Sequence, residues 1–136
     1  VDLMILMLGT NDCKTRYGAS AAVIARGLDQ VIRKARKSSP TPFDILVISP
    51  IHLGKDVGEP DFDPEFNSDS EAVSRNLAAE YRKVALLNHA AFLNAADFAS
   101  PSVTDREHLD EAGHAALADA VYRRISLMYG ALSDVI

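Results

Sequence analysis

Residues 1–12 of the chain read VDLMILMLGTND and join a short apolar run to a turn. The apolar run extends from Leu3 to Leu8, and Gly9 ends it after too few residues for an ordinary helix, so a strand is expected. A run that is apolar at every position, rather than at alternate ones, indicates a strand covered on both faces inside a parallel sheet. The Gly9–Asp12 turn would then lie at the carboxyl end of this strand.

Apolar runs and helical spacings alternate along the rest of the chain. Two more buried strands are predicted at residues 45–48 and 91–95, with a long loop over residues 51–70. Three helices are predicted from the spacing of apolar residues and from cap residues: Ser20 to Lys37, about Ser70 to His89, and the tail from Asp110. Strands that alternate with helices indicate an α/β fold, a three-layer α/β/α sandwich around a parallel sheet.

Size and charge exclude several classes of protein. The 136 residues correspond to one domain or a piece of one, and the formal net charge of −5, without a basic run, argues against nucleic acid as a partner. The longest apolar run is too short to cross a bilayer, so no integral membrane segment is expected. The lone Cys13 predicts no internal disulfide and hence a cytoplasmic protein, although a targeting segment ahead of Val1 would change that expectation.

The turn after the first strand holds one candidate site residue. Working residues in open parallel sheets gather beyond the carboxyl ends of the strands, and Asn11 would lie there. Its amide N–H can be aimed at an oxygen that becomes negative in a transition state, while Gly9 allows a sharp backbone turn. The alternative for an isolated Gly-Thr-Asn-Asp is an Asx-type turn that only closes the strand.

A second candidate is the pair formed by Asp105 and His108, just ahead of the last helix. Residues three apart on a helical turn project from the same side, so the carboxylate can reach the imidazole. An aspartate that accepts from one ring nitrogen leaves the other free to take a proton from a hydroxyl nucleophile. The alternative is a solvated turn or a helix cap.

Together, Gly9-Thr10-Asn11-Asp12 and Asp105-Arg106-Glu107-His108 resemble the third and fifth blocks of the SGNH (GDSL-like) hydrolase superfamily. The neighbouring sequence, including Cys13-Lys14, is most similar to its bacterial arylesterase/acyltransferase branch. The resemblance implies the flavodoxin-like SGNH fold, a serine ester hydrolase activity without a cofactor, and a small ester as substrate. It makes Asn11 an oxyanion donor next to Gly9, His108 the general base and Asp105 its orienting acid.

The resemblance also predicts what this chain lacks. The Gly-Asp-Ser block that supplies the nucleophile is absent, and no Gly-x-Ser-x-Gly elbow replaces it. We therefore expect residues 1–136 to be the C-terminal portion of one hydrolase domain, without its first strands and inactive by itself. Ser20 is interpreted as a helix cap and Ser49 as the end of a strand.

The spacing of the histidines and the surroundings of the cysteine in the sequence do not support a metal or a thiol mechanism. His114 follows His108 by six residues, which does not place two imidazoles on one helical face, so a structural role is expected for it. His52 and His89 have no partners at ligand spacing, and Cys13 has no adjacent base.

The expected activity is therefore hydrolysis or transfer of an acyl group through a serine acyl-enzyme in the complete protein. Two alternatives stay open: an inert α/β binding module that keeps the fold, and a hydrolase in which Asp12 or Asp105 activates water. An unpaired edge of the first strand would favour self-association into homo-oligomers.

Overall fold

The computed structural model describes residues 1–130 of the chain. Its core is a parallel sheet in the order β1-β2-β3, made of β1 (Leu3–Leu6), β2 (Asp44–Ser49) and β3 (Ala91–Asn94). Leu3 of β1 lies opposite Asp44 of β2, and Leu46 of β2 lies opposite Ala91 of β3. Within residues 1–130, no strand pairs with the outer edge of β1.

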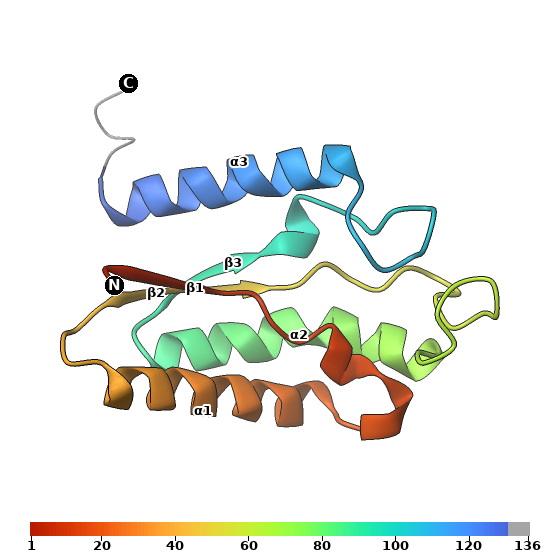
Figure 1. Cartoon of the computed structure of the whole chain (residues 1–136), viewed down its shortest axis with the longest axis horizontal. Coiled ribbons are helices and arrows are strands. Elements are labelled where there is room, and N and C mark those ends of the chain that lie inside the picture. The colour runs from red at the N-terminus through yellow and green to blue at the C-terminus, as the bar shows by residue number, and fades with distance from the viewer. Residues whose placement is uncertain (131–136) are drawn as a thin grey trace.

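Long helices cover both faces of this sheet, as predicted. They are α1 (Ala21–Ser38), α2 (Ser68–Leu87) and α3 (Glu111–Met128). Helices α1 and α2 lie side by side on one face, and α3 lies alone on the other (Figure 1). The result is the three-layer α/β/α arrangement, with short 3-10 helices η1 (Asn11–Cys13), η2 (Thr15–Tyr17) and η3 (Ala95–Asp97) in the loops.

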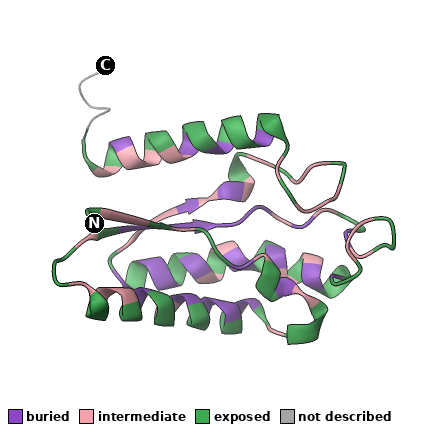
Figure 2. Cartoon of the chain, in the orientation of Figure 1, coloured by how far each residue is buried: buried purple, intermediate pink, exposed green. Residues whose placement is uncertain are grey.

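The central strand is the most buried element. From Ile45 to Ser49 every residue of β2 is buried, and the buried positions continue on the sheet-facing sides of α1 and α2 (Figure 2). Alternate residues of β2 enter different clusters: Ile45 and Val47 pack with α1 and α2, whereas Leu46 and Ile48 pack with α3. This two-sided burial explains why the strand is continuously apolar.

The first strand differs from its prediction. It ends at Leu6 rather than Leu8, and Ile5, Met7 and Leu8 are about half exposed, at 44%, 46% and 50%. The apolar run was expected to be covered on both faces, but the cover is partial: Leu3 packs against the cluster that includes α3, and Met4 and Leu6 pack against the cluster of α1 and α2. The position of β1 at the edge of the described sheet therefore accounts for the exposure.

Side-chain caps fix where the helices begin. Ser20 accepts a hydrogen bond from the N–H of Val23, which confirms it as the cap of α1. Asn67 and Ser70 form a reciprocal capping box, so α2 begins at Ser68, earlier than predicted. Among residues 1–130, no helix combines the length and apolar composition needed to cross a membrane.

Candidate active site

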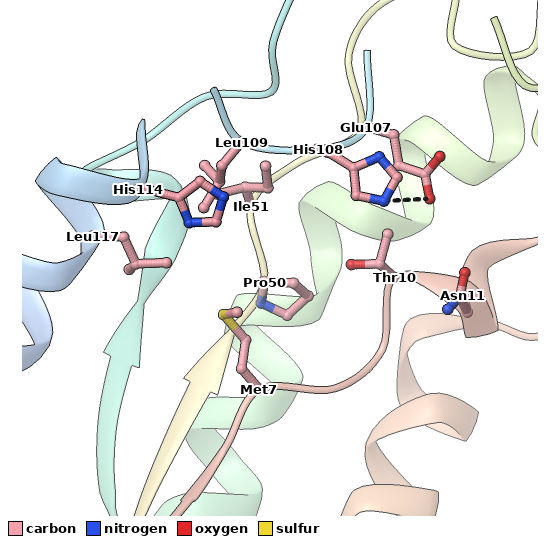
Figure 3. A pocket seen from close by; sticks show the side chains of 10 residues that line it. All are labelled: Met7, Thr10, Asn11, Pro50, Ile51, Glu107, His108, Leu109, His114 and Leu117. Carbon is pink, nitrogen blue, oxygen red and sulfur yellow. Dashed lines mark ion pairs between the residues drawn. The ribbon is translucent and has the colours of Figure 1, made fainter. Parts of the chain in front are cut away.

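A pocket of about 270 Å³ lies at the carboxyl ends of the strands. Its wall comes from the turn after β1, the segment after β2, the segment that leads into α3 and the first turns of α3 (Figure 3). The lining side chains are Met7, Thr10, Asn11, Pro50, Ile51, Glu107, His108, Leu109, His114 and Leu117. Two of the predicted site residues, Asn11 and His108, thus border one cavity.

The turn after β1 depends on a close approach between Gly9 and helix α2. Gly9 has φ +130°, and a Cβ at this position would collide with the hydroxyl of Tyr81. That hydroxyl is buried and donates a hydrogen bond of 2.8 Å to the carbonyl of Leu8. Gly9 is therefore required by both its backbone conformation and its packing, although it is not part of the pocket wall.

Asn11 is the first residue of η1, and its side chain is exposed at the pocket. The turn closes through backbone bonds, because the N–H of Asp12 donates to the carbonyl of Gly9 at 3.1 Å. Among residues 1–130, no protein group forms a hydrogen bond with the Asn11 amide. The alternative of an Asx-type turn through the Asn11 side chain is therefore not what the structure shows, and the amide N–H of Asn11 is free to donate into the pocket.

Asp105 and His108 are in direct contact. Oδ2 of Asp105 lies 2.6 Å from Nδ1 of His108, which leaves Nε2 on the open side of the ring. The pairing does not come from a helical turn, as the spacing suggested. Arg106 adopts a left-handed conformation with φ +65°, and this tight turn allows Oδ1 of Asp105 to accept from the N–H groups of Glu107 and His108, each at 2.9 Å.

These contacts set the charge of the pair. Burial opposes ionisation of Asp105, but hydrogen bonds from Glu107, His108 and Ser102 outweigh it and hold the pKa of this carboxyl well below its usual range. For His108, the hydrogen bond to Asp105 raises the pKa above its ordinary value, and the carboxylates of Glu107 and Asp63 add to the shift. Asp105 is thus a permanent anion that stabilises the imidazolium.

Two titratable residues of the pocket wall, Glu107 and His114, were not identified as site residues from the sequence. Glu107 places Oε1 3.9 Å from Nε2 of His108 (Figure 3), whereas Asp105 contacts the other ring nitrogen, Nδ1. His114, expected to be structural, borders the pocket from the first turns of α3. The sequence offered one signal for Glu107, namely a charged residue directly before the histidine. This signal could not identify a site residue, because the two middle positions of the Asp-x-x-His motif have no fixed residue type.

The remaining candidates lie away from this chemistry. Ser49 is buried at the end of β2, and within residues 1–130 its hydroxyl has no hydrogen-bond partner. Burial raises the pKa of the Cys13 thiol to about 11, helped by Asp12, which disfavours a thiolate nucleophile. No serine borders the pocket in the described part of the chain, and no metal-binding group of three or more His, Cys, Asp or Glu side chains occurs there.

The family model of the GDSL-like lipase/acylhydrolase family matches residues 1–116. No curated protein matches the chain at a significant level. Among solved structures, one crystal structure is 34% identical, with a TM-score of 0.90 over 96% of this chain and 60% of its own. A carbohydrate acetylesterase from Sinorhizobium meliloti is 26% identical, with a TM-score of 0.80 over 94% of this chain and 61% of its own.

An aryl esterase from M. smegmatis is 28% identical, with a TM-score of 0.82 over 92% of this chain and 60% of its own. The chain therefore spans about 60% of the length of these structures. The long family match, the three-layer fold and the pocket between the two motifs lead to one conclusion: the chain belongs to the GDSL-like lipase/acylhydrolase family.

Proposed function

We propose that the complete protein hydrolyses carboxylic esters, or transfers their acyl groups, through a serine acyl-enzyme. The observation that carries the proposal is the 2.6 Å contact between Asp105 and His108 at a pocket that Asn11 also borders. In the proposal, residues 1–136 supply the base pair and the oxyanion donor. The serine comes from a segment outside these residues.

His108 is the general base. Its Nε2 takes the proton of the serine hydroxyl as the serine oxygen attacks the ester carbonyl, and Asp105 stabilises the imidazolium that forms. The amide of Asn11 donates to the oxyanion of the tetrahedral intermediate. When this intermediate collapses, Nε2 gives its proton to the leaving alcohol, and water or a second alcohol then repeats the steps to release the acyl group.

The nature of the pocket and the similar structures support an ester as substrate. Apolar side chains line one side of the pocket: Pro50, Ile51, Leu109 and Leu117. They suit the hydrocarbon part of an ester, while the polar groups of Asn11 and His108 suit its carbonyl and leaving oxygen. The S. meliloti protein is called a carbohydrate acetylesterase and the M. smegmatis protein an aryl esterase.

Labelling and turnover test the proposal in the complete protein. We expect a fluorophosphonate to modify one serine and to abolish hydrolysis of p-nitrophenyl acetate, and we expect His108→Ala to prevent both. Hydrolysis that survives the phosphonate would point to water activated by a carboxylate. Absence of both labelling and hydrolysis would favour the inert binding module.

A further inference from the structure

Glu107 is a carboxylate enclosed in the pocket wall. Its side chain retains 12% of its accessible surface, compared with 73% for the neighbouring His108. Oε1 lies 3.9 Å from Nε2 of His108, which is too far for a hydrogen bond. In Figure 3 the carboxylate lies above Thr10 and Asn11, beside the ring edge that carries Nε2.

No group among residues 1–130 donates a hydrogen bond to this carboxylate. The backbone N–H of Glu107 donates to Asp105, but the Glu107 oxygens have only the distant imidazole nearby. Withdrawing a carboxylate from water is unfavourable unless donors or cations replace the lost hydration. The described chain provides no such replacement apart from the ring of His108.

The charges around Glu107 do not compensate for this burial. Burial is the main cause that raises the pKa of Glu107 above its ordinary value, and Asp63 and Asp105 add to the shift, whereas the charges of His108 and Lys14 oppose it. Lys14 is itself paired with Glu65, at 2.7 Å. Within residues 1–130, the imidazole of His108 is therefore the one cationic group paired with Glu107.

The position of Glu107 beside Nε2 of His108 identifies which part of a substrate could bring a positive charge to it. If His108 gives its proton to the leaving alcohol, the alcohol oxygen must come within hydrogen-bond distance of Nε2. Groups attached one or two carbons from that oxygen would then lie within a few ångströms of the Glu107 carboxylate. The acyl part, which is bound to the serine, is the portion that stays behind.

We propose that Glu107 is a specificity-determining residue that selects esters whose alcohol part carries a positive charge close to the ester oxygen. This inference rests on the proposed ester hydrolysis, and it extends that proposal by specifying the charge of the preferred alcohol part. A unit charge about 5 Å from a carboxylate in a protein surface site interacts strongly enough for at least a tenfold preference.

The test compares two esters of nearly equal shape in the complete protein. Acetylcholine carries a quaternary ammonium group, and 3,3-dimethylbutyl acetate has a neutral carbon in its place. We expect kcat/KM to favour acetylcholine about tenfold in the wild type, and Glu107→Gln to reduce this ratio to about one, whatever its effect on the rate with the neutral ester. Glu111→Gln removes the same charge from an exposed position of α3 and should keep the tenfold ratio.

Each result decides the inference. A wild-type ratio near one, or a ratio that Glu107→Gln leaves unchanged, would overturn it while leaving ester hydrolysis intact. If neither ester is hydrolysed, the proposed function fails. A binding experiment with the two alcohols then tests the charge selection by Glu107 separately. Choline should then shift the imidazole resonances of His108 in this chain more than 3,3-dimethylbutanol does, and Glu107→Gln should remove the difference; equal shifts would overturn the selection of charge.

Discussion

The hydroxyl of Tyr81 donates a 2.8 Å hydrogen bond to the carbonyl of Leu8 and joins helix α2 to the turn that carries Asn11. The same hydroxyl occupies the space in which a side chain at Gly9 would begin. Helix α2 and the turn after β1 are far apart in sequence, and their contact fixes the backbone at Leu8 and Gly9, just before Asn11.

Gly9→Ala should destabilise the chain by about 2–4 kcal/mol, because it combines a disfavoured positive φ with a steric collision. Tyr81→Phe should cost about 1–3 kcal/mol, because it leaves the carbonyl of Leu8 without its donor. In the double variant the collision is relieved, so its loss should be smaller than the sum of the two single losses. Urea unfolding of all four proteins measures these differences, and strict additivity would contradict the shared contact.

His108 should titrate above its ordinary pKa of about 6.5 in this chain, and Asp105→Asn should lower that value. The imidazolium is the form that Asp105 stabilises, so its contribution to stability is present below the unfolded pKa and is lost as the pH rises through the folded one. NMR titration of the ring protons measures the shift directly. In the complete protein, kcat/KM should rise with pH through the same elevated pKa, because the base acts when neutral.

Asn11→Ala should lower kcat of the complete protein by roughly a hundredfold or more, with a smaller change in KM, since the amide serves the transition state. The side chain is exposed and makes no hydrogen bond within residues 1–130, so the free energy of unfolding should change by less than about 0.5 kcal/mol. Steady-state kinetics and urea unfolding separate these effects. A loss of stability with unchanged kcat would assign Asn11 to the turn alone.

The two serines considered as candidates should behave differently from each other and from a nucleophile. Ser20→Ala should cost about 1 kcal/mol because it removes the cap of α1. Ser49→Ala should be nearly neutral, because the buried hydroxyl has no partner among the described residues. A fluorophosphonate should label neither serine in the purified chain, and mass spectrometry that finds either one modified would refute the assignment of both.

The outer edge of β1 should promote self-association of the chain. Its backbone is unpaired within residues 1–130, and the exposed side chains of Ile5, Met7 and Leu8 adjoin it. Ile5→Lys should shift the equilibrium toward monomer, whereas Val103→Lys, at an exposed loop position away from the edge, should leave it unchanged. Sedimentation velocity provides the measurement, and a monodisperse wild-type monomer at high concentration would contradict the prediction.

The layers of the fold could be predicted because each element carries a local signal. Continuous apolar residues identified β2, and helical spacing with the Ser20 cap identified α1. The end of β1 could not be predicted in this way, because apolar character alone does not show where neighbouring strands stop pairing. The role of Tyr81 could not be predicted either, because its hydrogen-bond partner, the carbonyl of Leu8, lies in a segment that is distant in sequence.

The motifs identified Asn11 and His108, and the structure brings both to one pocket. Glu107 remained undetected because its position in the motif has no fixed chemistry and its importance depends on burial. The left-handed turn at Arg106 was also unforeseen, because a non-glycine residue gives no sign in sequence of a positive φ.

The turn from Ser102 to His108 closes on itself. The N–H of Ser102 donates to the carbonyl of His108 at 2.7 Å, and the N–H of Arg106 donates to the carbonyl of Ser102 at 3.0 Å. Apart from the bond of 2.7 Å that the N–H of Gly54 donates to the carbonyl of Arg106, these hydrogen bonds lie within one short peptide, whereas the place of Asn11 relies on a distant helix. Substitutions in the sheet or the helices should therefore disturb the aim of His108 less than substitutions within residues 102–108 or at Gly54.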